Sequence, residues 1–269
     1  MNPQQQARLE AIKRNWQQKR DINTRLGQIK TKLAVYSGKG GVGKTTVAVN
    51  LAAYLASQGH PVGLLDTDID CPNVTKALGV KERPNVQDNR LIPPESHGVK
   101  VVSMAFFQEN EEEAIIWRGP MIHNAINQFL QITDWGDLDF LVVDLPPGTS
   151  DAPLTVMQVL PLDGFVVVTT PQELAVMDAK RSINMVRKMN MNVLGVVENF
   201  SGEMFGSGAG EKLAKDLGLP FLGKVAMRRD YLGSSQPTVL KSAEVRKEYD
   251  HIFQGITASL EALGKSVAR

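Results

Sequence analysis

The sequence has 269 residues, of which 42% are hydrophobic and 22% are charged, and its net charge at pH 7 is +1. This balance is typical of a soluble globular chain, and it gives no bulk attraction to nucleic acid or to a membrane surface, so we expect neither as a partner. The chain has no run of about 18 apolar residues and begins with a polar segment, so we expect a cytoplasmic protein.

Residues 1–31 are predicted to form a separate N-terminal helical arm. Their large apolar side chains recur at helical spacing, with charged or amide residues between them. These side chains are Leu9, Ile12, Trp16, Ile22, Leu26 and Ile29. We expect one or two amphipathic helices packed on the domain or on a partner subunit. A flexible or regulatory tail is the alternative.

Residues 32–269 are predicted to form one domain in which short apolar runs alternate with longer helical periods. The predicted strands are Leu33–Ser37, Val62–Asp66, Val99–Met104, Phe140–Asp144, Phe165–Thr170, Val193–Glu198 and Phe221–Val225. The predicted helices are Lys44–Ser57, Pro120–Gln131, Ala152–Val159, Glu173–Met189, Glu211–Leu217 and a final helix with Val245 to Leu263 on one stripe. Because the apolar strands are continuous rather than alternating, both of their faces should be buried. The predicted fold class is therefore α/β, with three layers and a mostly parallel sheet flanked by helices.

A glycine-rich loop follows the first strand of this domain and opens its first helix. The loop comprises Gly38, Lys39, Gly40, Gly41, Val42, Gly43, Lys44, Thr45 and Thr46. Glycines let successive backbone N–H groups point at one anion, and the start of the helix adds partial positive charge. In this strand–loop–helix context the pattern predicts a P-loop NTPase. Lys44 would reach the β- and γ-phosphates, and the Thr45 hydroxyl would bind Mg²⁺.

Two further strands end in carboxylates that should lie beside this loop, because ligands of such sheets sit at the carboxyl ends of the strands. One strand ends at Asp66 and continues with Asp68 and Asp70, and another ends at Asp144. Asp144 has the form of a Walker B aspartate, which holds Mg²⁺ directly or through water. Capping or turn formation is the alternative role for Asp66 and Asp70. Gly148 would let the backbone approach the γ-phosphate and sense it.

Lys39, a second lysine near the start of the loop, resembles the signature of the deviant Walker A group, to which ParA, MinD, nitrogenase iron protein and Mrp/ApbC belong. In those families this lysine reaches across a dimer to the partner's nucleotide. The resemblance therefore implies that Lys39 stabilises charge on the transferring phosphoryl group in trans. It also implies that Asp68 orients the attacking water and that Asp66 helps to order the Mg²⁺ shell. A solvated loop lysine is the alternative for Lys39.

From about Lys32 to about Phe253 the chain closely resembles the Mrp/ApbC branch, the ATPases known as iron–sulfur cluster carriers. The strings that carry this resemblance are Trp117-Arg118-Gly119-Pro120-Met121, Asp134-Trp135-Gly136-Asp137-Leu138-Asp139, Asp144-Leu145-Pro146-Pro147-Gly148-Thr149, Thr170-Pro171-Gln172 and Gly195-Val196-Val197-Glu198-Asn199. The resemblance implies a slow, dimer-dependent ATPase that uses ATP and Mg²⁺, forms a homodimer across the nucleotide, and serves an iron–sulfur client or scaffold protein. It further implies that Asn199 reads the adenine edge, which favours ATP over GTP.

The resemblance fails at one chemically decisive place, where the family typically carries a C-x-x-C pair. Two such pairs, one from each subunit, bridge a [4Fe–4S] cluster at the dimer interface, whereas residues 200–208 of this chain contain no cysteine. Cys71 is its single cysteine, so a dimer would bring two thiols to a cluster that takes four. We expect Cys71 to be a small buried residue without a metal. A MinD- or ParA-like positioning or regulatory ATPase without any iron–sulfur cluster is therefore the alternative function.

Overall fold

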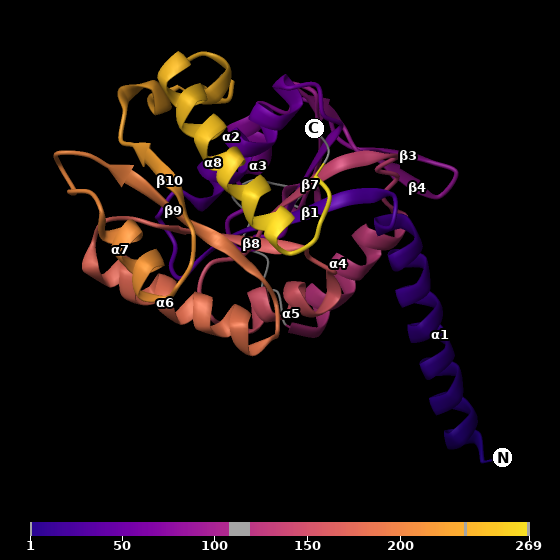
Figure 1. The fold of residues 1–269 in the computed structure, drawn as a ribbon. Helices are drawn as coiled ribbons and strands as arrows, with labels where there is room; N and C mark the ends of the chain where they lie inside the picture. The colour runs from indigo at the N-terminus through magenta and orange to yellow at the C-terminus, as the bar shows by residue number, and fades with distance from the viewer. Residues whose placement is uncertain (1, 108–118, 234–235, 268–269) are drawn as a thin grey trace.

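The computed structural model describes residues 2–107, 119–233 and 236–267. These residues form an eight-stranded sheet with the strand order β10-β9-β8-β1-β7-β2-β6-β5 (Figure 1). Its strands are β1 (Ile29–Ser37), β2 (Val62–Asp66), β5 (Glu95–Ser96), β6 (Val99–Ser103), β7 (Leu138–Asp144), β8 (Gly164–Thr169), β9 (Val193–Ser201) and β10 (Phe221–Ala226). Neighbouring strands pair in parallel, except that β5 and β6 are antiparallel. The predicted mostly parallel sheet is confirmed, and each of the seven predicted strands lies in it.

Helices cover both faces of the sheet, which gives the expected three layers (Figure 1). They are α1 (Pro3–Leu26), α2 (Lys44–Ser57), α3 (Val74–Leu78), α4 (Gly119–Ile132), α5 (Asp151–Val159), α6 (Glu173–Lys188), α7 (Ala209–Asp216) and α8 (Ala243–Ala262). Buried side chains of α2, α3 and α8 form one hydrophobic core with one face of the sheet. On the other face pack α4, α5 and the end of α1, and α6 and α7 complete that layer.

The central strand β1 shows why continuous apolar strands predict burial on both faces. Leu33 and Val35 belong to the core beneath α2 and α8, whereas Ala34 and Tyr36 belong to the opposite core. All four side chains are fully buried. Because side chains alternate between the two faces of a strand, only an unbroken apolar run can fill both cores. Parallel pairing with β7 then sets Val35 opposite Asp144, so the carboxyl ends of these strands meet.

Among the short elements that were not predicted are α3, β5 and the strands β3 (Asn85–Gln87) and β4 (Arg90–Ile92), which form a hairpin. The hairpin turns at Asp88 and Asn89, whose φ angles are 50° and 58°. A tight hairpin turn of this kind needs positive φ at both central residues, which Asp and Asn tolerate. The strands that flank the turn are too short to show the alternation of apolar and polar residues by which a strand is recognised in a sequence. The predicted boundary of the N-terminal arm is also corrected. Strand β1 begins at Ile29, so residues 29–31, which we expected in the arm, are part of the sheet.

The predicted arm forms a single helix, α1, which leaves the body of the molecule (Figure 1). Ile22 and Leu26, near its end, are buried in the core that contains α4. Leu9, Ile12 and Trp16 are exposed. Across the described residues, none of the helices combines the length and the apolar character that crossing a lipid bilayer would take.

Candidate nucleotide-binding site

The glycine-rich loop connects β1 to α2 at the carboxyl edge of the sheet. β1 ends at Ser37 and α2 begins at Lys44, as the sequence predicted. Gly41 and Gly43 have φ angles of 80° and 79°, which glycine adopts without the steric cost that a Cβ atom would bring. This left-handed backbone curls the loop back over the start of α2. Such a loop at a helix N-terminus is the arrangement that binds phosphate groups.

Two glycines of the loop are required by packing, and two face open space. A Cβ atom on Gly38 would lie 2.1 Å from a backbone carbon of α6, and one on Gly43 would lie 2.2 Å from Asn199 Nδ2. A Cβ atom on Gly40 or Gly41 would meet no atom within 4 Å. The loop is therefore held against α6 and β9 on one side and is open on the other, where an anion can reach its backbone.

Lys44, Thr45 and Asp144 are joined by direct hydrogen bonds. Lys44 Nζ donates to Asp144 Oδ1 at 2.6 Å, and Thr45 Oγ1 donates to Asp144 Oδ2 at 2.7 Å. Lys44 and Asp144 are both buried. Removing either charge from water alone would cost free energy, and the attraction between the two opposite charges offsets that cost. The structure thus brings together the predicted phosphate-binding lysine, the predicted Mg²⁺-binding hydroxyl and the strand-end carboxylate.

Asp66 lies beside this network because the β2–β7 register sets it opposite Asp144. Its carboxylate accepts hydrogen bonds from Ser103 Oγ at 2.8 Å and from the backbone N–H groups of Asp68 and Val74 at 3.1 and 3.3 Å. Burial, and after it the charge of Asp144, raises the pKa of Asp66 to about 8. With both oxygens engaged by internal donors, Asp66 braces the segment that follows β2.

Asp68 faces the phosphate loop. Its Oδ2 atom lies 3.8 Å from Lys44 Nζ, and its Oδ1 atom accepts the backbone N–H of Cys71 at 3.3 Å. Burial raises the pKa of Asp68, and the charge of Lys44 acts in the opposite direction. Cys71 itself is exposed, so the prediction of a buried cysteine is wrong. The turn held by Asp68 carries residue 71 out of the core and onto the surface.

The oxygen donors at this edge suit Mg²⁺ bound together with a phosphate. The Thr45 hydroxyl and the Asp144 carboxylate are hard oxygen ligands of the kind that Mg²⁺ prefers, and Asp66 lies beside them with its own oxygens bonded to internal donors. In the part of the chain that the structure describes, no three His, Cys, Asp or Glu side chains are placed to hold a metal ion by themselves. Mg²⁺ usually keeps several waters and takes only one or two protein carboxylates beside its phosphate ligands.

Lys39 and Gly148 lie around the same loop. Lys39 is partly exposed, and its backbone carbonyl accepts a hydrogen bond from Ser37 Oγ at 3.0 Å. Gly148 donates its N–H to the Ser37 carbonyl at 2.9 Å and has a φ angle of 85°. The Tyr36 hydroxyl donates to the Gly148 carbonyl. The segment after β7 is therefore tied directly to the start of the phosphate loop.

Asn199 and Glu198 fix the segment that follows β9. Asn199 is buried, and its Nδ2 atom donates to the carbonyl of Val42 in the phosphate loop at 2.8 Å. Glu198 is fully buried, and its carboxylate accepts the N–H groups of Gly208 and Gly210 at 3.0 and 2.7 Å. These bonds tie the end of the cysteine-free segment 200–208 back to β9. Of the strings that carry the family resemblance, residues 117–118 lie outside the described residues.

Ser103 is a site residue that the sequence analysis missed. Its hydroxyl donates to Asp66 Oδ2 and accepts the backbone N–H of Ala105 at 3.1 Å. Ser103 ends β6, which is the neighbour of β2, so it lies at the same carboxyl edge as the predicted carboxylates. A polar residue at the end of a buried strand in this sheet was the signal that could have identified it.

A mostly parallel sheet with a phosphate loop after its central strand, and with carboxylates at neighbouring strand ends, is the architecture of the P-loop NTPases. A family model described as ParA, NUBPL iron-transfer P-loop NTPase, matches residues 28–260. The chain belongs to this family, and the prediction of an ATPase of the Mrp/ApbC type is confirmed.

Individual relatives agree with this assignment. The chain is 41% identical over 261 residues to an iron-sulfur cluster carrier protein of Methanocaldococcus jannaschii, with 91% of this chain and 90% of that protein covered. Its fold resembles that of a nucleotide-binding protein from Archaeoglobus fulgidus in complex with ADP, with a TM-score of 0.72 and 37% identity over 82% of this chain and 91% of that one. It also resembles the cell division ATPase MinD of Pyrococcus furiosus, with a TM-score of 0.65, 20% identity and coverage of 87% and 100%, which shows a shared fold alone.

Proposed function

We propose that this chain hydrolyses ATP in the cytoplasm as a homodimer with the nucleotides at the subunit interface, and that this cycle serves iron–sulfur cluster delivery. The observation that carries the catalytic part is the contact of Lys44 and Thr45, at the end of the phosphate loop, with Asp144. A lysine, a hydroxyl and a carboxylate in this arrangement are the groups that position a magnesium-bound triphosphate.

The protein groups have distinct tasks in binding the triphosphate. Lys44 would exchange its bond with Asp144 for the β- and γ-phosphate oxygens, which the open face of the loop admits. Mg²⁺ would supply positive charge against those phosphates when bound. Thr45 and Asp144 would hold it directly, and Asp66 would act on its shell through water because its own oxygens are engaged.

Hydrolysis itself is assigned to Asp68 and Lys39. Asp68 is buried beside Lys44, where it can accept a hydrogen bond from the attacking water and aim it at the γ-phosphorus. Lys39 is partly exposed at the start of the loop, so its ammonium group can reach a nucleotide held by a second subunit. A cation placed there stabilises the charge that spreads over the transferring phosphoryl group.

Adenine is the base that this site suits. The Asn199 amide nitrogen donates a hydrogen bond to the backbone carbonyl of Val42. The amide oxygen would accept a hydrogen bond from the exocyclic amino group of adenine. Guanine has a carbonyl at the corresponding position, which would repel that oxygen. The ADP bound by the Archaeoglobus fulgidus relative supports this assignment.

The cargo role is drawn from the relatives, and the chemistry of this chain changes how it would work. The Methanocaldococcus jannaschii relative is named an iron-sulfur cluster carrier protein. This chain has one cysteine, so even its dimer lacks the four thiolates that hold a [4Fe–4S] cluster. We therefore assign the cluster ligands to a client or scaffold protein, with the ATPase acting on the complex.

Anaerobic reconstitution with iron and sulfide, followed by a transfer assay, tests this function. We expect no cluster absorption band from the wild-type chain or from Cys71→Ser, and an ATP-dependent rise in the rate at which a cluster-loaded scaffold protein supplies an apo-ferredoxin. A band on the chain alone that Cys71→Ser removes would show that the chain itself carries the cluster. If the rate of cluster transfer is the same with and without ATP and with and without this chain, the iron–sulfur role is excluded and a regulatory ATPase is the function that remains.

A further inference from the structure

The outer part of α1 carries apolar side chains that the protein does not bury. The exposed fractions of Leu9, Ile12 and Trp16 are 43%, 46% and 75%, although large apolar residues at helical spacing normally face a core. Their spacing of three and then four residues places them within about 60° of one another around the helix. They form one continuous stripe, which we call the α1 stripe.

The base of α1 is anchored, so the α1 stripe is held away from the body of the molecule. Ile22 and Leu26 are 2% and 1% exposed within the core that contains α4. At about 1.5 Å per residue, the 24 residues of α1 span about 36 Å, and the helix visibly extends beyond the domain (Figure 1). A helix fixed at one end and free along an apolar stripe can enter a groove on another molecule.

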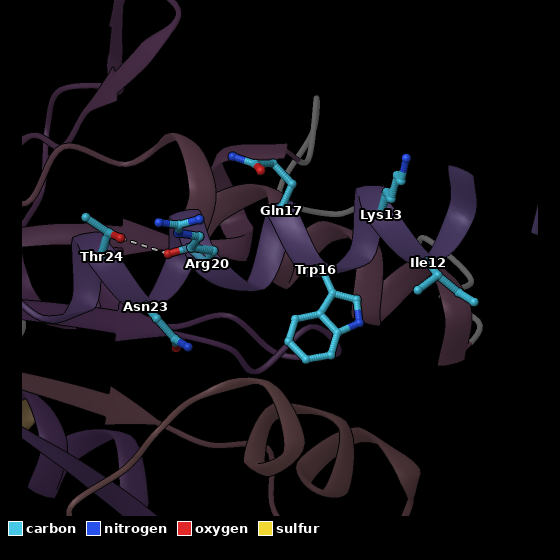
Figure 2. A pocket seen from close by; sticks show the side chains of 7 residues that line it. All are labelled: Ile12, Lys13, Trp16, Gln17, Arg20, Asn23 and Thr24. Carbon is cyan, nitrogen blue, oxygen red and sulfur yellow. Dashed lines mark hydrogen bonds between the residues drawn. The ribbon is translucent and has the colours of Figure 1, made fainter. Parts of the chain in front are cut away.

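Figure 2 shows the face of α1 that would make this contact. Trp16 and Ile12 point to one side, and Lys13 and Arg20 lie along the other. These four side chains lie along one open flank of α1. Apolar anchors with basic side chains beside them fit a groove that is apolar at its floor and acidic at its rim.

The charge of the chain is concentrated in this helix. Within α1, six residues are Lys or Arg and two are Asp or Glu, which gives it a net charge of +4 in a chain whose net charge is +1. The rest of the chain therefore carries −3. This separation favours an acidic partner for α1 and disfavours a second α1, because two such helices would repel each other.

A lipid surface fits this helix less well than a protein does. Helices that lie in a membrane interface have a broad apolar face. The α1 stripe has three large apolar side chains, and seven of the 24 residues of α1 are Gln or Asn. Anchors at positions i, i+3 and i+7 are instead the spacing at which helices insert into protein grooves.

We propose that α1 is a docking helix that inserts Leu9, Ile12 and Trp16 into an acidic, apolar groove of a partner protein. The inference goes beyond the proposed ATPase function and does not depend on it, because none of the α1 side chains that the structure describes is part of the nucleotide site.

Calcium-loaded calmodulin, an acidic protein with apolar methionine-lined grooves, serves as a defined probe of this chemistry. Titration of the full chain, followed by calorimetry and tryptophan emission, should show saturable binding and a blue shift. Trp16→Ala should weaken binding by about thirtyfold or more, as truncation of a buried tryptophan anchor does. Val86→Ala, which truncates an apolar side chain of similar exposure (68%) on β3, should leave it unchanged. Both variants should keep the melting temperature and ATPase rate of the wild type.

Lys13→Gln with Arg20→Gln tests the charged part of the contact. This double variant should slow association and reduce the dependence of binding on salt concentration. Absence of calmodulin binding, or binding that Trp16→Ala leaves intact, would overturn the proposal. So would Trp16-dependent binding to phosphatidylglycerol vesicles without calmodulin binding, or Trp16-dependent self-association in sedimentation, because the occupant would then be a membrane or a second copy.

Discussion

Replacement of Gly38 by alanine should separate the phosphate loop from α6 and destabilise the protein. The added Cβ atom would lie 2.1 Å from the carbonyl carbon of Asp178 and 2.6 Å from the backbone nitrogen of Ala179. Restoring a contact of 3.0 Å requires a movement of about 1 Å, and backbone atoms cannot rotate away as a side chain can. Overpacking of this kind costs about 3 kcal/mol, which corresponds to a fall in melting temperature of roughly 6–12 °C for a domain of this size.

Gly40→Ala is the matched control, because a Cβ atom there would meet no atom within 4 Å. Thermal unfolding of both variants, followed by circular dichroism, should show a large fall in melting temperature for Gly38→Ala. The melting temperature of Gly40→Ala should change by less than about 2 °C. Equal melting temperatures for Gly38→Ala and the wild type would refute the close packing of the loop on α6. Equal losses in the two variants would show that the loop disfavours any side chain, whatever it contacts.

Three further predictions concern catalysis and pH. Asp68→Asn should keep nucleotide affinity and lower the rate of ATP hydrolysis at least about hundredfold, because it removes the group that orients the water; a wild-type rate of phosphate release would exclude that role. Lys39→Ala should lower the rate by a similar factor with a small loss of affinity. In mixed dimers with wild-type chain, only the nucleotide that faces the intact Lys39 should be hydrolysed, so about half of the wild-type rate should remain. An unchanged rate in the pure variant means that no lysine acts in trans. The Asp139 carboxylate is partly buried, which opposes ionisation, but its contacts with Lys30 at 2.7 Å and His60 at 3.0 Å lower its pKa overall. The ionised Asp139 carboxylate should stabilise the folded protein above about pH 4, and this stabilisation should be lost as the pH falls through its native pKa. The free energies of unfolding of the wild type and Asp139→Asn, measured in urea, should therefore become equal in acid.

Most of the fold could be predicted because its signals are local. A strand buried on both faces needs an unbroken apolar run, and the segments ending at Ser37, Asp66 and Asp144 each show one. The start of α2 at Lys44 follows from the glycines before it. The turn at Asp88 and Asn89 is also local, but its flanking strands are too short to be recognised by their period.

The features that could not be predicted depend on contacts between distant segments. The bond from Ser103 to Asp66 joins two strands that are 37 positions apart, and it exists because β2 and β6 are neighbours in the sheet. The bond from the Asn199 amide nitrogen to the carbonyl of Val42 joins residues that are 157 positions apart, and it leaves the amide oxygen for the predicted contact with the base. The exposure of Cys71 was predicted wrongly because a lone cysteine carries no spacing pattern, and only the turn held by Asp68 decides where it points.

Calorimetric titration of the purified chain with ATP, in the presence and absence of Mg²⁺, tests the proposed nucleotide site most directly. The contact of Lys44 and Thr45 with Asp144 predicts one nucleotide per chain, bound more tightly with Mg²⁺, and loss of that binding in Lys44→Ala. If the wild type takes up no adenine nucleotide, or if Mg²⁺ and Lys44 make no difference to the affinity, the site assigned to this loop is contradicted.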